Sequence, residues 1–74
     1  MINYNPLWKT MKKKDITQYR LNKEFDISRG QISRLKHNYN VSTHTLNRLC
    51  EILDCGLEDV VEYTKTATEN PDNS

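Results

Sequence analysis

Two histidines and two cysteines are the side chains of this 74-residue chain best suited to binding a metal ion or acting as nucleophiles. They occur in the order His37, His44, Cys50 and Cys55, with six, five and four residues between them. Structural zinc sites use closely spaced pairs of ligands, which this order lacks, so Cys50 is predicted to be a small core residue. The chain also has only two glycines and a mass of 8.7 kDa. We therefore expect no metal site, no cofactor and no enzymatic activity.

Basic residues gather in the first half of the chain and acidic residues in the second. Residues 1–40 contain nine Lys and Arg but three Asp and Glu, a net charge of +6, whereas residues 41–74 have a net charge of −5. The overall charge of +1 is thus a cancellation. A chain polarised in this way is typical of a protein with one half that faces a polyanion.

Membrane insertion and secretion are not indicated by the sequence. No apolar run approaches the ~20 residues of a membrane span. The first residues, MINYNPLWK, lack the apolar stretch of a signal peptide. Two cysteines are too few for a disulfide framework, so we expect a cytoplasmic protein.

Residues that favour helix N-termini divide the chain into segments. Asn5 directly precedes a proline, and Thr17, Ser28 and Ser42 each precede a segment with apolar residues three or four positions apart. Strand signals are almost absent. The predicted helices cover residues 6–14, 18–25, 29–37 and 43–53.

The end of the chain is expected to hold one more short helix. Gly56 is predicted to end the fourth helix in the left-handed conformation. A last helix is predicted over residues 57–63, with Leu57, Val60 and Val61 buried. Residues 65–74 contain no large apolar residue and are predicted to form a disordered tail. The expected structure is an all-α domain of four to five helices over residues 1–64.

The segment 17–36, TQYRLNKEFDISRGQISRLK, places two short helices on either side of a tight break. Leu21 and Phe25 of the first helix are expected to face Ile32 and Leu35 of the second, while Ile27 fills the turn. This spacing predicts a helix-turn-helix, with the polar side of the second helix projecting outward.

The same segment resembles the Cro/lambda-repressor-like, or XRE-like, helix-turn-helix family. Its TQxxL…(I/V)S…(I/V)SxL pattern is matched by Thr17-Gln18, Leu21, Ile27-Ser28, Ile32-Ser33 and Leu35. The flanking segments also resemble the first, fourth and closing helices of the family, so that the resemblance covers residues 4–63. Two positions depart from the pattern: Asn22 stands where the family usually has Ala, and Asp26 where it usually has Gly. Asp tolerates a left-handed backbone better than most residues, so Asp26 fits the turn.

The resemblance implies that the second motif helix enters the major groove of DNA. It assigns base-reading roles to Arg29, Gly30, Gln31, Ser33 and Arg34. It assigns phosphate contacts to Thr17, Gln18, Ser28, Lys36, Asn38, Asn40 and Thr43. Two arginines on one face favour a site that contains guanine.

The function predicted from these features is a small transcriptional regulator of bacterial or phage-like type, acting as a repressor. A single module buries little surface, so we expect a homodimer on a palindromic site. Self-association is expected through the fourth and last helices or to be induced by DNA. A second interpretation is a protein-interaction module, an antitoxin or antirepressor, whose acidic face on those helices docks a protein partner. RNA binding is less favoured, because Trp8 and Tyr19 are expected to pack in the core or at its rim.

Overall fold

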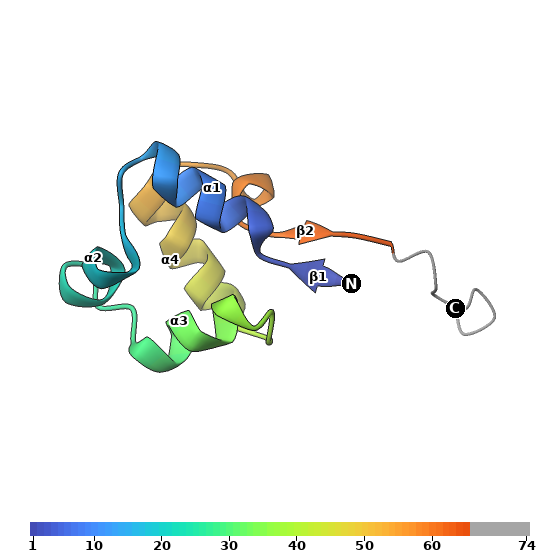
Figure 1. Cartoon of the computed structure of the whole chain (residues 1–74), viewed down its shortest axis with the longest axis horizontal. Coiled ribbons are helices and arrows are strands. Elements are labelled where there is room, and N and C mark those ends of the chain that lie inside the picture. The colour runs from blue at the N-terminus through green and yellow to red at the C-terminus, as the bar shows by residue number, and fades with distance from the viewer. Residues whose placement is uncertain (66–74) are drawn as a thin grey trace.

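The computed structural model describes residues 1–65, which form four α-helices, one 3₁₀ turn and a two-stranded sheet (Figure 1). In the view of Figure 1, α1 and α3 lie on opposite sides of α4. The all-α prediction is confirmed, with the small sheet as an addition. The predicted tail lies outside the described residues from position 66 onward. In chain order the elements are β1 (Ile2–Asn3), α1 (Asn5–Lys13), α2 (Gln18–Lys23), α3 (Arg29–Lys36), α4 (Thr43–Leu53), the 3₁₀ turn η1 (Leu57–Asp59) and β2 (Glu62–Tyr63).

One apolar core receives side chains from every α-helix. Leu7 of α1, Leu21 of α2, Leu35 of α3 and Leu49 of α4 are completely buried. Burying a leucine side chain contributes about 1.5–3 kcal/mol, so these four residues are the main link between the helices. The remaining core residues are Tyr4, Met11, Ile27, Ile32, Leu53 and Val60.

Three of the four predicted helix caps are confirmed. The hydroxyl oxygens of Thr17, Ser28 and Ser42 accept hydrogen bonds from the backbone N–H three residues later, at 3.1–3.2 Å. The prediction for Asn5 is wrong, because Asn5 is already the first residue of α1. Its own N–H donates to Oδ1 of Asn3, at the end of β1, at 2.9 Å. The chain therefore enters α1 one residue earlier than the proline suggested.

Each α-helix is followed by an Asp or Asn residue in the left-handed conformation. These residues are Asp15, Asp26, Asn38 and Asp54, with φ between 51° and 60°. The expectation for Asp26 is thus confirmed. The expectation for Gly56 is wrong, because its φ is −86°. Asp54 has already ended α4, and its N–H bonds to carbonyl oxygens of that helix.

The predicted last helix over residues 57–63 is wrong. Only η1 forms there, and the chain then extends into β2, which pairs antiparallel with β1. Val60 is buried as predicted, but Val61 is only half-buried and Leu57 is 52% exposed. The N–H groups of Val60 and Val61 still bond to the carbonyl of Leu57, whereas Glu62 and Tyr63 pair with the N-terminal strand instead of continuing a helix.

Cys50 lies near the end of α4 and Cys55 just beyond it. Both are half-buried against the core, and no disulfide joins them. Burial raises the pKa of the Cys55 thiol, and the adjacent Cys50 raises it further. Within residues 1–65, no three His, Cys, Asp or Glu side chains are grouped so that they could hold a metal ion. No helix in this part of the chain is long and apolar enough to cross a membrane.

Candidate nucleic-acid interface

The turn between α2 and α3 is fixed by hydrogen bonds to both the N–H and the carbonyl of one residue, Ile27. The N–H of Ile27 donates to the carbonyl of Leu21 at 3.0 Å, and Nδ2 of Asn22 donates to the carbonyl of Ile27, also at 3.0 Å. The Ile27 side chain is 4% exposed, which confirms that it fills the turn. Asn22 therefore supplies a donor that an alanine at this position would lack.

A third contact ties the same turn to α4. Nη2 of Arg48 donates to the carbonyl of Phe25 at 2.6 Å, and the Arg48 side chain is half-buried. Phe25 itself is half-buried against the core. The angle between α2 and α3 is thus set by the core, by Asn22 within the motif and by Arg48 from α4.

The packing of α3 leaves the predicted base-reading stripe on the surface. Ile32 and Leu35 point into the core, while Arg29, Gly30, Ser33 and Arg34 are exposed. A Cβ atom added at Gly30 would meet only Oγ of Ser28, at 3.9 Å, so the fold does not require glycine there.

Gln31 differs from the rest of the stripe because it is half-buried and held by α4. Its Oε1 accepts a hydrogen bond from Oγ1 of Thr45 at 3.0 Å. Thr45 is 4% exposed and is the one buried polar residue among residues 1–65. The Gln31 side chain is thereby fixed in direction, with its amide nitrogen still available as a donor.

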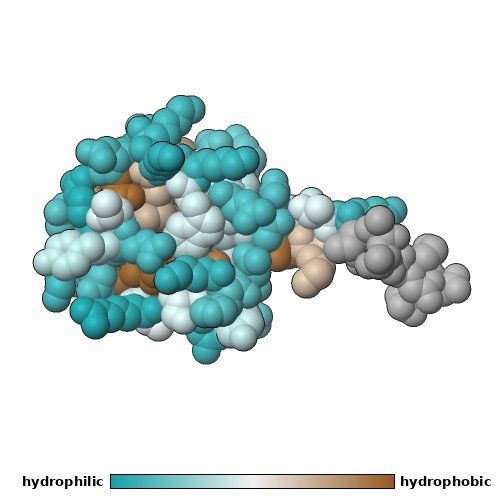
Figure 2. All heavy atoms as spheres, viewed as in Figure 1, coloured by the Kyte–Doolittle hydropathy of each residue, from teal (hydrophilic) through white to brown (hydrophobic). Residues whose placement is uncertain are grey.

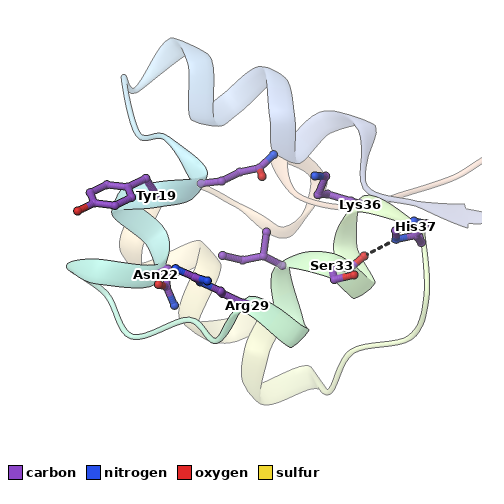
Figure 3. A pocket seen from close by; sticks show the side chains of 8 residues that line it. Tyr19, Asn22, Arg29, Ser33, Lys36 and His37 are labelled. Atoms are coloured by element: carbon purple, nitrogen blue, oxygen red, sulfur yellow. Dashed lines mark hydrogen bonds between the residues drawn. The ribbon is translucent and has the colours of Figure 1, made fainter.

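A surface cavity of about 260 Å³ lies where α2 meets α3 (Figure 3). It brings Gln18 of α2 together with Arg29, Ser33 and Lys36 of α3, so four predicted DNA contacts share one face. His37 ends this face, with its Nδ1 2.8 Å from the carbonyl oxygen of Ser33. The other residues around the cavity are Tyr19, Asn22 and Ile32.

Tyr19 is a member of this face that the sequence analysis missed. It was expected in the core or at its rim, yet it is 69% exposed. Figure 3 shows its ring projecting outward from α2, beside the cavity that Arg29 also lines. The signal was available: Leu21 sets the buried side of α2, and a residue two positions away on a helix does not share that side. Trp8, by contrast, does pack against the core.

Residues 6–66 match the family of Cro/C1-type HTH DNA-binding domains. The chain belongs to this family. Its structure is also similar to the crystal structure of the transcriptional regulator VanUg (form II), at 33% sequence identity and a TM-score of 0.76. The similarity covers 82% of this chain and 81% of that one. Among curated proteins, none matches the sequence.

In this Cro/C1-type domain, the residues that were predicted to contact phosphates lie on both sides of α3. Thr17 and Gln18 lie on the α2 side, where Thr17 is also the cap of α2. On the other flank, Asn40 lines a second hollow together with Arg34. Ser28 and Thr43 are exposed at the starts of α3 and α4.

Two polar side chains of the motif region already form hydrogen bonds within the domain. Oδ1 of Asn38, a predicted phosphate contact, accepts the backbone N–H of Tyr4 at 3.1 Å and so joins the end of α3 to the start of α1. Arg20 forms a paired contact with Glu24 at 3.0–3.2 Å. This hydrogen-bonded carboxylate raises the pKa of the Arg20 guanidinium. Both side chains therefore have partners before any ligand is present.

Proposed function

We propose that this chain is a sequence-specific regulator of transcription that binds duplex DNA by placing α3 in the major groove. The observation that carries the proposal is the division of α3 into two sides. Ile32 and Leu35 anchor one side in the core, and the other side presents two arginines with small residues beside them. A helix of about 10–12 Å diameter fits a major groove about 12 Å wide.

The exposed side chains of α3 suit the base edges of that groove. Each guanidinium of Arg29 and Arg34 can donate two hydrogen bonds to O6 and N7 of guanine. The fixed Gln31 offers its amide nitrogen to an acceptor such as N7 of a purine. Ser33 and Gly30 are small and allow α3 to lie close to the bases.

The flanking residues are proposed to hold the two phosphate backbones. Gln18 and Lys36 would contact one strand from the α2 side, and Asn40 and Thr43 the other from the α4 side. Thr17 and Ser28 would add contacts near helix starts. Such contacts set the position of the protein on the duplex without reading its sequence. In Asn38 the acceptor oxygen already binds the N–H of Tyr4, so only Nδ2 would donate to a phosphate, from a side chain that is fixed in direction.

Fluorescence anisotropy with duplexes selected from a random pool tests this proposal. The variants Arg29→Ala and Arg34→Ala should each weaken binding to the preferred duplex by about 1–3 kcal/mol and relax specificity at one base pair. Lys9→Ala is a matched control, because it removes one exposed positive charge from α1, on the other side of α4 in Figure 1. Equal losses in all three variants, or no loss, would reject base reading by α3.

We further propose that the protein acts as a repressor and that two copies bind a palindromic site. One small module buries too little surface for tight specific binding, and two half-sites about 34 Å apart would present both recognition helices to one face of the duplex. The affinity should fall with salt at a log–log slope of about −0.9 per neutralised phosphate.

A protein partner for the acidic part of the chain is a second candidate. The acids between positions 51 and 62 are all exposed: Glu51, Asp54, Glu58, Asp59 and Glu62. In residues 1–65 none of them forms an ion pair. Full regulation in cells by the double variant Arg29→Ala with Arg34→Ala would favour this candidate over DNA binding.

A further inference from the structure

The two cysteines stand at the two ends of one hydrogen-bonded turn. The N–H of Cys55 donates to the carbonyl oxygen of Cys50 at 3.1 Å. Inside this bond, the N–H of Asp54 donates to the carbonyl oxygen of Glu51 at 3.3 Å. Asp54 has φ 51° and ψ 56°, the left-handed conformation. Two nested bonds of this kind around a left-handed residue form a Schellman motif, so α4 ends in this motif.

The motif brings the two thiol side chains together. In a Schellman motif, the residue after the left-handed position packs its side chain near that of the residue whose carbonyl it binds. Both of these residues are cysteines here. The backbone bond between them keeps their Cα atoms within about 7 Å, the limit for a disulfide that forms without backbone movement.

We propose that Cys50 and Cys55 are an oxidative modification site, at which a disulfide closes reversibly across the end of α4. Both residues are half-buried and keep part of their surface in contact with solvent. Figure 2 shows the body of the domain with a mostly hydrophilic surface, in which the apolar areas are small. A small oxidant or reductant dissolved in water can therefore reach the site. The inference does not depend on DNA binding.

A low-molecular-mass disulfide, such as oxidised glutathione, is the class of oxidant that we expect. One cysteine thiolate attacks a glutathione sulfur, which forms a mixed disulfide and releases one glutathione thiolate. The thiolate of the other cysteine then attacks the protein sulfur of the mixed disulfide and releases the second glutathione. The two protein thiols lose two electrons and two protons, and the oxidant becomes two glutathione thiols. An excess of a small thiol reverses both steps.

The surroundings of Cys55 make this exchange slow at neutral pH. Burial raises the pKa of the Cys55 thiol, and the neighbouring Cys50 and Asp59 raise it further, against a smaller opposing effect of Lys14. Since the thiolate is the reacting form, a raised pKa leaves less of it at pH 7. The rate of closure should therefore rise as the pH rises towards the pKa of Cys55.

The disulfide would fasten the C-terminal segment to α4. Cys55 begins the stretch that continues through η1 into β2. This stretch is held by the buried side chain of Val60 and by Oγ1 of Thr10, which donates to the carbonyl oxygen of Asp59 at 2.8 Å. A covalent bond between Cys50 and Cys55 adds to these contacts and restricts the unfolded chain. Closure should therefore stabilise the domain.

Intact-mass measurement of the full chain tests the site. The protein is incubated with oxidised glutathione, and the remaining thiols are then blocked with a maleimide. The chain should lose two hydrogens, carry no glutathione and take up no maleimide. Cys50→Ser and Cys55→Ser each keep one thiol, so both variants should retain glutathione as a mixed disulfide. Retention of glutathione by the unmodified chain to the same extent, or cross-linked dimers in place of the internal disulfide, would overturn the inference.

A displaced thiol is the matched control for the geometry of the turn. The double variant Cys50→Ala with Glu51→Cys keeps two thiols but moves one to an exposed position of α4. Its disulfide should close at least tenfold more slowly than that of the unmodified chain. Equal rates would show that the Schellman motif does not position the thiols.

Thermal unfolding gives the second readout. Closure should raise the Tm by about 4 °C or more, and dithiothreitol should reverse the gain. In Cys50→Ala with Cys55→Ala, the oxidant should leave the Tm unchanged. The turn contains none of the residues proposed to contact DNA, so affinity for the preferred duplex should change by less than about twofold on closure. A closed disulfide with an unchanged or lowered Tm, or with a larger loss of affinity, would overturn its role in fastening this segment alone.

Discussion

Oγ1 of Thr45 donates a hydrogen bond to Oε1 of Gln31 at 3.0 Å, which joins the first turn of α4 to the middle of α3. Oγ1 of Thr45 also lies 3.2 Å from Oγ of the cap residue Ser42. The bond therefore connects the start of one helix to a predicted base-reading side chain of another. It fixes the direction of Gln31 before DNA is present, so less side-chain entropy is lost on binding.

Thr45→Val keeps the shape of the side chain and removes this bond. The free energy of unfolding should fall by about 1 kcal/mol, because Oε1 of the half-buried Gln31 loses its partner. Affinity for the preferred duplex should fall more than affinity for unrelated duplexes. Urea denaturation measures the first effect and anisotropy titration the second. Thr43→Val, the same change at an exposed position of α4, should not alter stability by more than about 0.5 kcal/mol.

Asn22→Ala introduces the residue usual for the family at this position. It should nevertheless destabilise this chain by about 0.5–1.5 kcal/mol, because the carbonyl of Ile27 loses its donor at 3.0 Å. Chemical denaturation gives the value, with Lys23→Ala on the exposed side of α2 as the control. Stabilisation by Asn22→Ala would show that the bond to Ile27 does not hold the turn.

Gly30→Ala tests separately whether glycine is required for stability and for DNA binding. There is open space for the added methyl group, so the helix should gain up to about 1 kcal/mol in stability. The same methyl group would lie between α3 and the bases, and affinity for the preferred duplex should fall about tenfold or more. A variant that is more stable and binds equally well would mean that glycine has no role in DNA recognition.

The left-handed residues after the helices give a matched pair of substitutions. Asp54→Gly should stabilise the domain by about 0.5–1 kcal/mol, since glycine adopts this backbone without strain and a negative charge leaves the C-terminal end of α4. Asn38→Gly relieves the same strain but removes the bond to the N–H of Tyr4, so it should destabilise. Thermal unfolding of the two variants compares them directly. A similar gain in both would show that the Asn38–Tyr4 bond contributes nothing.

Much of the motif could be predicted because its determinants are local. Thr17, Ser28 and Ser42 cap helices through N–H groups three residues away, and the spacing of Leu21, Ile27, Ile32 and Leu35 fixes which sides are buried. Four of the five predicted base-reading positions, Arg29, Gly30, Ser33 and Arg34, are exposed together for the same reason. Asp26 could be placed in the left-handed conformation because the family usually has glycine at this position and Asp tolerates that backbone.

The features that were missed depend on residues far apart in the sequence. The strands are two residues long and pair Ile2 with Tyr63, so neither shows an alternating pattern of its own. The contacts of Arg48 with Phe25 and of Asn38 with Tyr4 likewise join residues that are 23 and 34 positions apart. Gly56 was predicted to end α4 because glycine favours the left-handed conformation, but Asp54 adopts this conformation two residues earlier.

Selection of duplexes from a random pool, followed by titration of the enriched sequence at several salt concentrations, tests the central claim most directly. The account predicts an enriched two-fold symmetric site with guanine in each half, lost in the variant Arg29→Ala with Arg34→Ala and retained in Lys9→Ala. Affinity for that site should fall steeply with salt. Failure to enrich any sequence, or enrichment of the same site by the double variant, would contradict sequence reading by α3.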